Sequence, residues 1–419
     1  MRATAGHRAG KQGGSMSAVP KSITVFKGDT SGLRNTVNVL EKIQPGYFAQ
    51  EVDKIYRRAW LPVTSAAELP QRGSYVAVDV PPLKASLLVV RGQDDIVRAF
   101  YNICRHRANK LVPDNTQGSK LAFTCPFHAW TFAADGRCIG ITDESQFVGM
   151  DKSTRALIPV RCEVAEGLVF VNFSAEPRET LSEWLGDIYG GYQGHFDGRE
   201  QIANWSIVVN ASWHITVNAF TEGYHSLFLH RATLPDYQGG KGNPMRHRPF
   251  LEVMPRHGRY SAKANPDHKM TPVEEIAYCA GRKLYPAFPR VDCSAPDFPS
   301  AVNPGRVDNW AFDITEFFPC FILIDGAEWH QCMWFWPIDA DHTQIRVIDY
   351  AYGAASVGDR LAHSYLRVRN REVFREDIST MEAIHASVKS GAMPEIVLSQ
   401  QEMLLQKHYA MVEKMVGEP

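Results

Sequence analysis

Two short groups of cysteine and histidine are the residues best suited to chemistry in this 419-residue chain. Cys104 and His106 form the first group, and Cys125 and His128 form the second after 18 intervening residues. Together they offer two thiolate and two imidazole donors to metal ions. A zinc ion in a Cys2His2 site takes the same donors, and chance pairing among 8 cysteines and 15 histidines is a second interpretation.

The order of the donors favours an iron–sulfur cluster over these two interpretations. Zinc fingers usually pair cysteine with cysteine and histidine with histidine, whereas both groups here are mixed. Mixed pairs suit a [2Fe–2S] cluster in which one iron has two cysteine ligands and the other has two histidine ligands. Both groups end expected strands and have aromatic neighbours, which argues against chance. These neighbours are Phe100, Tyr101, Phe123, Phe127, Trp130 and Phe132.

A third polar group recurs at helical spacing further along the chain. Asn218, Glu222 and His225 stand at positions i, i+4 and i+7, and His230 follows five residues after His225. A solvated helix face is the simpler interpretation of such a stripe. The segment has few basic residues and many aromatic ones, however, so we expect a buried helix that bends or ends before His230. Its apolar stripe consists of Trp213, Val217, Phe220 and Tyr224.

A carboxylate near the C-terminus completes a second possible metal site. Asp377 falls beside Ile378 on the apolar face of an expected helix, where a carboxylate is costly unless it is paired or bound to metal. Two histidines and one carboxylate are the ligand set of non-heme Fe(II) oxygenases. A buried arginine partner for Asp377 is the alternative. Glu376 and Glu382 are expected on the surface of the same helix.

The spacing Cys-x-His-x18-Cys-x2-His, with Arg107 and Trp130 close by, resembles the Rieske motif of ring-hydroxylating oxygenases. Ala108 and Ala129 stand where that family usually has glycine. The later pattern Asn-x3-acid-x2-His-x4-His, followed by an aspartate, resembles the catalytic domain of the same family. The resemblance covers residues 35–410 and presents both motifs in the family's order.

The resemblance implies a role for each matching residue. His225, His230 and Asp377 would bind a mononuclear Fe(II), while the four residues of the first motif would hold the [2Fe–2S] cluster. Glu222 stands where the family usually has aspartate, and would connect an iron-ligand histidine to a cluster-ligand histidine of a neighbouring subunit. Asn218 is expected with Glu222 among the catalytic residues, and Glu382 is the acid that follows Asp377 in the motif.

Patterns of hydrophobicity predict the elements that position these residues. Short runs with turn residues between them predict an all-β region, and Asp135-Gly136 marks one of its hairpins. The second half mixes helices and strands. The expected strands cover residues 86–90, 96–103, 130–132, 138–141, 168–173, 205–209, 317–324, 331–336 and 344–350, and the expected helices begin near residues 33, 211 and 366. Residues 236–308 are expected to form long loops.

The predicted fold class is therefore α+β: an all-β Rieske domain and a larger α+β catalytic domain, whose antiparallel sheet and helices carry the mononuclear iron. The expected divisions are a tail over 1–32, helices over 33–60 that pack on the catalytic domain, the Rieske domain over 61–175 and the catalytic domain over 176–419. Either Met1 or Met16 could be the start of translation.

Composition narrows the function classes. Lys and Arg number 45 against 46 Asp and Glu, which argues against a nucleic-acid binder. No apolar run reaches the length that spans a bilayer, and the eight cysteines are too sparse for a disulfide scaffold. These features predict a cytoplasmic protein without membrane or nucleic-acid partners.

Together the two sites predict an oxygenase that receives electrons at the cluster and uses them with O2 at the Fe(II). The chain lacks a nucleotide-binding Gly-x-Gly-x-x-Gly after a strand. This absence and the resemblance together imply that a ferredoxin, an NAD(P)H-dependent reductase or both supply the electrons. The resemblance implies a homotrimer, with or without a β subunit. The leading prediction is hydroxylation of a small apolar aromatic or polycyclic substrate, as in aromatic hydrocarbon catabolism. A monooxygenase that performs oxidative N- or O-dealkylation of a substituted aromatic is the alternative. An electron carrier with an inactive second domain and a zinc hydrolase are weaker alternatives.

Overall fold

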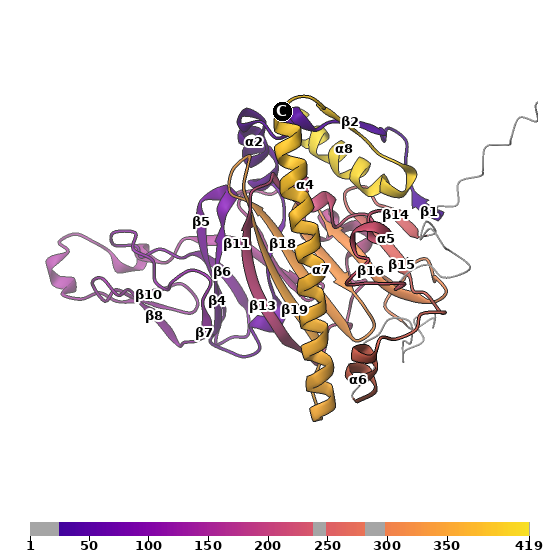
Figure 1. Cartoon of the computed structure of the whole chain (residues 1–419). Helices are drawn as coiled ribbons and strands as arrows, with labels where there is room; N and C mark the ends of the chain where they lie inside the picture. Colours follow the sequence, from indigo (N-terminus) through magenta and orange to yellow (C-terminus); the bar gives the residue numbers. More distant parts are fainter. Residues whose placement is uncertain (1–24, 238–248, 281–297, 419) are drawn as a thin grey trace, which may run out of the picture.

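The computed structural model describes residues 25–237, 249–280 and 298–418, and its largest feature is an eight-stranded sheet (Figure 1). All neighbouring strands in this sheet are antiparallel except the parallel edge pair β1 and β14. In spatial order the strands are β1 (Val25–Gly28), β14 (Phe250–Val253), β15 (Gly258–Lys263), β16 (Trp310–Phe317), β17 (Phe321–Asp325), β18 (Trp329–Pro337), β19 (Thr343–Tyr352) and β13 (Arg199–Val209).

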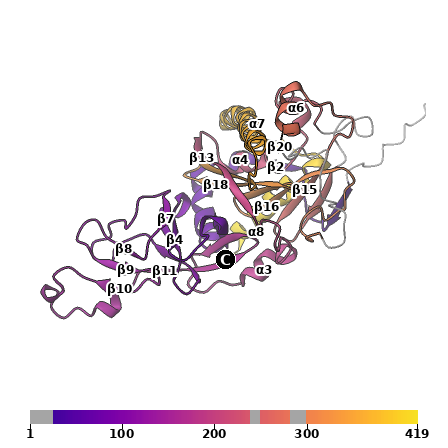
Figure 2. The same ribbon diagram turned by 90° about the horizontal axis from the view of Figure 1, so that it is seen from below.

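Two further sheets build the region expected to hold the cluster. The seven-stranded sheet has the order β3 (Leu61–Ser65), β12 (Leu168–Asn172), β11 (Pro159–Ala165), β6 (Val97–Tyr101), β5 (Ala85–Arg91), β4 (Ser74–Val80) and β7 (Gln117–Ser119). The three-stranded sheet has the order β10 (Cys138–Gly140), β9 (Thr131–Ala133) and β8 (Ala122–Thr124). Figure 2 shows this small sheet projecting from the rest of the chain.

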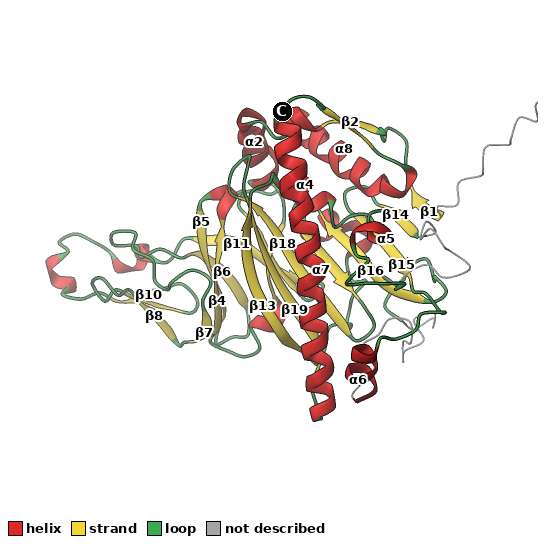
Figure 3. Ribbon diagram, in the orientation of Figure 1, coloured by secondary structure: helices red, strands yellow, loops and turns green. Residues whose placement is uncertain are grey.

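Helices cover the eight-stranded sheet, and the longest, α7 (Val357–Lys389), crosses its face over β13, β18 and β19 (Figure 3). Ser356 caps its first turn together with Asp359, and Gly391, with φ 75°, follows its last turn. The other helices are α1 (Val39–Lys42), α2 (Pro45–Glu51), α3 (Leu181–Leu185), α4 (Trp213–Asn218), α5 (Ser226–Leu229), α6 (Pro272–Ala280) and α8 (Met403–Gly417).

One hydrophobic core joins the two large sheets. Trp334 on β18 donates its indole N–H to the carbonyl of Pro62 on β3, at 2.9 Å. Its neighbour Phe335 contacts Phe220, whose ring also stacks on Phe374 of α7. Since successive residues of a strand point to opposite faces, the seven-stranded sheet and α7 pack on opposite faces of the eight-stranded sheet.

The fold class is the one the sequence predicts, and strands β5, β6, β12, β18 and β19 lie where they are expected. The single strand expected over 317–324 is wrong, because the chain turns between β16 and β17. Helical spacing from residue 33 is also misleading, since β2 (Thr36–Asn38) pairs with β20 (Glu395–Val397) before the short helices α1 and α2. Here pairing with a distant strand overrides local periodicity.

Two boundaries in the second half also differ. The C-terminal helix begins at Val357, nine residues before the expected start at 366, because the Ser356 cap lies beyond the periodic stretch. The expected long loops over 236–308 carry β14, β15 and α6, while residues 238–248 and 281–297 lie outside the described residues. Most of the N-terminal tail, residues 1–24, also lies outside them.

Across the described residues, no helix combines the length and apolar character needed to cross a bilayer.

Candidate metal centres

The four expected cluster ligands lie on two loops with the same backbone design. In each loop the cysteine N–H donates to the carbonyl five residues later, and the N–H four residues after the cysteine donates to the cysteine carbonyl. These distances are 2.7 and 3.0 Å in the loop of Cys104, and 2.8 and 3.0 Å in the loop of Cys125. The two loops therefore present two ligands each in a similar way.

The tight turn in each loop requires a left-handed residue. Ala108 and Ala129, the residues four positions after each cysteine, have φ values of 59° and 53°. A side chain with a Cβ is strained in this conformation, which glycine adopts freely. The turn geometry explains why the Rieske motif usually has glycine at both positions and why the smallest chiral residue is tolerated here.

The histidines and cysteines are at different depths. The thiols of Cys104 and Cys125 are buried, whereas His106 and His128 are half-buried, with their Nδ1 atoms 3.2 Å apart. The ring of His106 stacks on Trp130 at a centroid distance of 5.1 Å and an interplanar angle of 9°. The histidine end of the site thus faces the surface.

The separation of these donors distinguishes a two-metal cluster from a single zinc ion. Four ligands around one tetrahedral zinc would lie about 3.3–3.8 Å from one another. Among the described residues, only His225, His230 and Asp377 form a group of three potential ligands whose donor atoms all lie within 4.8 Å of one another. The two cysteines and two histidines therefore do not converge on one point, which fits a cluster with two irons.

Backbone amides shape the electrostatics of the thiols. Burial raises the pKa of Cys104 to about 11. Burial also opposes ionisation of Cys125, but hydrogen bonds from the backbone of Phe127 and His128 lower its pKa below the ordinary value. Such N–H donors stabilise negative sulfur, which is the form that binds iron.

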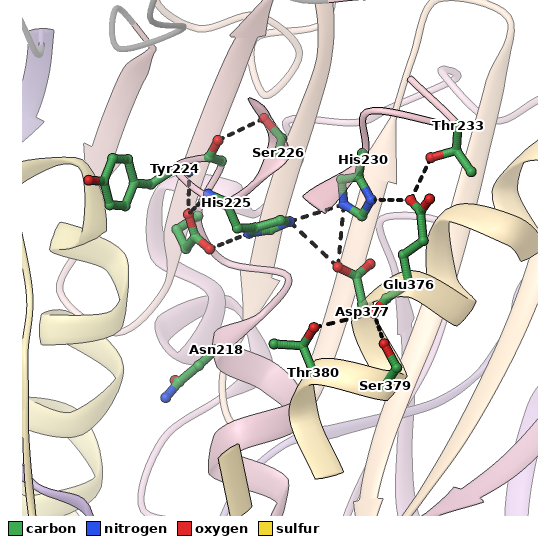
Figure 4. Close-up of polar contacts among 12 residues, drawn as sticks. Asn218, Tyr224, His225, Ser226, His230, Thr233, Glu376, Asp377, Ser379 and Thr380 are labelled. Atoms are coloured by element: carbon green, nitrogen blue, oxygen red, sulfur yellow. Dashed lines mark hydrogen bonds and ion pairs between the residues drawn. The ribbon is translucent and has the colours of Figure 1, made fainter. Parts of the chain in front are cut away.

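The second centre brings together residues at the two ends of α5 and one residue of α7 (Figure 4). His225 immediately precedes α5, His230 immediately follows it, and Asp377 lies in α7. The Nε2 atoms of the two histidines are 3.1 Å apart, and Asp377 Oδ1 lies 3.5 Å from His225 Nε2 and 3.3 Å from His230 Nε2. Donor atoms about 2.0–2.2 Å from one shared metal ion would have such separations.

A second layer of carboxylates holds both imidazole rings. Glu222 Oε1 bonds to Nδ1 of His225, and Glu376 Oε2 bonds to Nδ1 of His230 at 2.8 Å. Thr233 donates to the same Glu376 oxygen at 2.7 Å. With protons on both Nδ1 atoms, each Nε2 lone pair faces the centre, as in metal sites where a carboxylate orients a histidine ligand.

The expectation that Glu376 is a surface charge is wrong. Its side chain is only 23% exposed, because α7 turns it toward the segment after α5. Glu382 is half-buried and accepts two hydrogen bonds from Asn210. A helical wheel could not reveal either contact, since both partners come from other elements.

The charges at this centre favour a cation. Asp377 is 2% exposed, and its Oδ1 accepts no hydrogen bond. Burial disfavours the charged form of His225, but the neighbouring carboxylates of Glu222 and Asp377 raise its pKa to about 9. The contacts of Asp377 are with the histidines rather than with a buried arginine. The donors fit a divalent metal ion, and two histidines with one carboxylate are the set typical of non-heme Fe(II).

The single helical stripe expected through Asn218, Glu222 and His225 is wrong. Helix α4 ends at Asn218, and an irregular segment carries Glu222 and His225 to the start of α5. Gly223 within it lies against Tyr260, where a Cβ would approach the phenol oxygen to 2.3 Å. Asn218 points away from the centre and donates to the hydroxyl of Tyr409 at 2.6 Å (Figure 4).

A cavity of about 110 Å³ adjoins the second centre, and its walls are largely apolar. Glu222, His225, His230 and Asp377 contribute to one part of the lining. The remaining lining includes Ala219, Phe220, Gly223, Ser226, Leu234, Tyr237, Tyr260, Phe312, Ile314, Ile324, Trp329, Gln331, Arg369, Asn370, Val373 and Phe374. A small molecule in this cavity would lie next to the three donors.

Comparison with known families agrees with this architecture. Residues 59–159 match the Rieske [2Fe-2S] domain, and residues 196–418 match the catalytic domain of the ring hydroxylating alpha subunit. The chain therefore belongs to the ring hydroxylating alpha subunit family. This confirms the expected family, its α+β fold class and its pair of cofactors, a [2Fe–2S] cluster and a mononuclear iron.

Curated relatives include both monooxygenases and dioxygenases. The chain is 28% identical over 180 residues to the carnitine monooxygenase oxygenase subunit of Acinetobacter baumannii, covering 42% of this chain and 48% of the relative. It is 30% identical over 183 residues to the glycine betaine monooxygenase oxygenase subunit of Chromohalobacter salexigens, covering 43% and 40%. The alignments thus span less than half the length of these relatives.

Solved structures share the fold over nearly the whole chain. A quaternary ammonium Rieske monooxygenase superposes with a TM-score of 0.72 at 20% identity, covering 90% of this chain and 94% of that one. Naphthalene 1,2-dioxygenase with indole bound superposes with a TM-score of 0.73 at 20% identity, covering 94% of each chain. At such identity the likeness concerns the fold alone.

Proposed function

We propose that this chain is the oxygenase component of an oxidoreductase that hydroxylates a small organic substrate with O2 and externally supplied electrons. The observation that carries the proposal is the convergence of His225, His230 and Asp377 beside an apolar cavity. In this proposal Cys104, His106, Cys125 and His128 hold the [2Fe–2S] cluster, which passes single electrons. Bound Fe(II) would supply the chemistry of O2 activation.

The chain's own residues prepare the centre for that chemistry. Glu222 and Glu376 keep protons on the outer nitrogens of the two histidines, so that both inner nitrogens face Asp377. The aromatic and aliphatic cavity wall offers an apolar surface on which an organic substrate would lie beside the three ligands. An electron carrier with an inactive second domain would need neither feature.

Two reactions share this centre. Hydroxylation of R–H by O2 consumes two electrons and two protons and yields R–OH and water; cis-dihydroxylation places both oxygen atoms on an aromatic ring. Hydroxylation of a methyl group on nitrogen or oxygen gives an unstable product that loses formaldehyde.

The aromatic lining of the cavity suits an apolar aromatic substrate. The names of the carnitine and glycine betaine monooxygenase relatives support a monooxygenase, the class to which the dealkylating alternative belongs.

Partners and assembly follow from the same proposal. Electrons would come from a ferredoxin, an NAD(P)H-dependent reductase or both, and a homotrimer would bring one subunit's cluster near the next subunit's iron. Half-buried His128 and the 55% exposed ring of Phe127 leave the cluster loop open to such a neighbour. Glu222 would connect the two centres across that contact. A β subunit, a cytoplasmic location and the domain boundaries given above remain predictions.

The test is a single turnover with a substrate panel. Anaerobic holoprotein is reduced chemically and exposed to O2 with unsubstituted bicyclic aromatics, N- or O-methylated aromatics, or quaternary ammonium acids. Mass spectrometry then reads the products. A gain of two oxygens and two hydrogens indicates cis-dihydroxylation, a gain of one oxygen indicates monohydroxylation, and loss of a methyl group indicates dealkylation. Unchanged compounds throughout, from protein with both metals bound, would contradict the proposal.

A further inference from the structure

A buried arginine lines the cavity at some distance from the proposed iron ligands. Arg369 lies on α7, eight residues before Asp377, which corresponds to about 12 Å along the helix axis. It is only 7% exposed. The cavity therefore has a cationic part in addition to the part that carries the three metal donors.

The charge of Arg369 has no close carboxylate partner. Its Nη1 donates to the hydroxyl of Tyr278 at 2.7 Å, and the guanidinium lies 5.3 Å from the ring centroid of Tyr237. Its Nε is buried and makes no hydrogen bond. Within the part of the chain that the structure describes, no Asp or Glu forms an ion pair with it. Such burial is costly unless an anion joins the group.

Two buried carboxylates, Asp349 and Glu274, interact with Arg369 electrostatically but are hydrogen-bonded to other groups. Asp349 accepts from Gln331 at 2.7 Å and from Asn370 at 3.3 Å. Glu274 accepts from the backbone N–H of Thr271 at 2.7 Å. Both act on Arg369 only at longer range. Because Arg369 lines the cavity, an anion of suitable size inside the cavity would lie beside this side chain.

The rest of the lining is mostly apolar, with Gln331 and Asn370 among its polar members. Val373 and Phe374 lie between Arg369 and Asp377 on α7, and both line the cavity. Apolar side chains of the eight-stranded sheet also line the cavity: Phe312, Ile314, Ile324 and Trp329. A ligand that matches the cavity thus has an anionic group, an apolar body and a reactive end.

We propose that the physiological substrate carries a carboxylate that binds Arg369, while its apolar body directs the reactive carbon toward His225, His230 and Asp377. A guanidinium presents parallel N–H groups that match the two oxygens of a carboxylate. Recognition of the carboxylate needs no electrons and no O2. Only the position of the reactive carbon rests on the function proposed above.

Binding is measured by anaerobic titration calorimetry on the holoenzyme with matched acids and amides. The panel pairs 4-methoxybenzoate, 4-methoxyphenylacetate, 3-phenylpropanoate, 4-phenylbutanoate and 4-(trimethylammonio)butanoate with their primary amides. These acids vary the distance between the carboxylate and the far end. We expect at least one acid to bind about 30-fold or more tightly than its amide, the scale for loss of a buried charged partner.

Two variants of Arg369 assign the preference to its side chain. Arg369→Leu removes the charge and should abolish the preference for the acid, whereas Arg369→Lys should retain part of it. Arg375→Leu is the matched control, because Arg375 lies on the same helix with its side chain 71% exposed. Its preference should equal that of the unaltered protein. The acid and amide comparison on unaltered protein stands even if Arg369→Leu does not fold.

Two results would overturn the inference: no acid in the panel binds better than its amide, or the preference survives in folded Arg369→Leu. Failure of the proposed function gives a different pattern. If the preference depends on Arg369 but no bound acid is oxidised in a single turnover, carboxylate recognition stands and the oxygenase proposal fails. Asp377→Ala should keep the preference while losing turnover.

Discussion

Asp377 Oδ1 lies 3.3 Å from His230 Nε2, yet this buried oxygen accepts no hydrogen bond. The Nε2 atoms of His225 and His230 lie 3.1 Å apart, and both face this oxygen. When both histidines are neutral with their protons on Nδ1, all three facing atoms are acceptors, and a cation among them would give each a partner. This relationship underlies the proposed iron site.

Replacing Asp377 with alanine tests that relationship. We expect Asp377→Ala to lower the iron content by about one ion per chain and to end turnover, while the absorbance of the [2Fe–2S] cluster persists. Iron analysis and visible spectroscopy on the same sample give both values. Glu372→Ala on the same helix serves as the control, since Glu372 pairs with Arg371 and Arg375 away from the centre. Full iron content and full activity in Asp377→Ala would place the third ligand elsewhere.

Glu376 should affect how tightly the protein binds iron, rather than whether it can bind iron. Glu376→Gln keeps the shape of the side chain but weakens its hold on His230 Nδ1, so iron affinity should fall about 10- to 100-fold. Competition with a chelator measures the change. Thr233→Val, which removes only the hydroxyl donor to Glu376, should have a smaller effect in the same direction. Equal affinities in Glu376→Gln and the unaltered protein would show that this contact does not support the ligand.

Glu222 is expected to serve both His225 and electron transfer between subunits. Glu222→Gln should lower iron affinity as Glu376→Gln does. In samples loaded with both metals it should also slow the transfer of electrons from the cluster to the iron, with activity reduced about 10- to 100-fold or more. Freeze-quench spectroscopy after mixing reduced protein with O2 follows the oxidation of the cluster. A normal rate of cluster oxidation, together with a normal yield of product, would show that Glu222 is dispensable for this step.

Replacing the left-handed alanines of the cluster loops with glycine should stabilise the protein. Ala108→Gly and Ala129→Gly should each stabilise the folded loop by about 0.5–1 kcal/mol, because glycine relieves the strain at positive φ. The midpoint for loss of cluster colour in a guanidinium titration reports the change. Ala133→Gly in strand β9 is the control and should shift the midpoint in the opposite direction. A lower midpoint in both loop variants would show that the two alanines are not strained by their positive φ values.

Much of the two metal centres could be predicted from the sequence, because ligand type and spacing are local properties. His225 and His230 lie in one short segment, and Asp377 was identifiable as a carboxylate on an apolar helix face. The helical spacing that groups Asn218 with them requires one helix through the segment, whereas α4 ends at that residue.

Other parts of the site depend on packing between distant elements. The contact of Glu376 with His230 joins residues 146 positions apart, and periodicity assigned Glu376 to the surface. Elements α6, α7 and the sheet together bury Arg369, and it has no ion-pair partner among the described residues. The local sequence does not reveal this burial. The β2–β20 pairing likewise has no local sequence pattern, since its strands have three residues each.

The most direct test of the whole account is a single turnover under 18O2. Anaerobically reduced holoprotein is mixed with 18O2 and the substrate panel described above, and products are compared with those of Asp377→Ala. We predict 18O in an organic product, or an equivalent of formaldehyde from a methylated substrate, from the unaltered protein and neither from the variant. Equal products from both proteins, or cluster oxidation with no substrate oxidised although both metals are bound, would contradict an oxygenase centred on His225, His230 and Asp377.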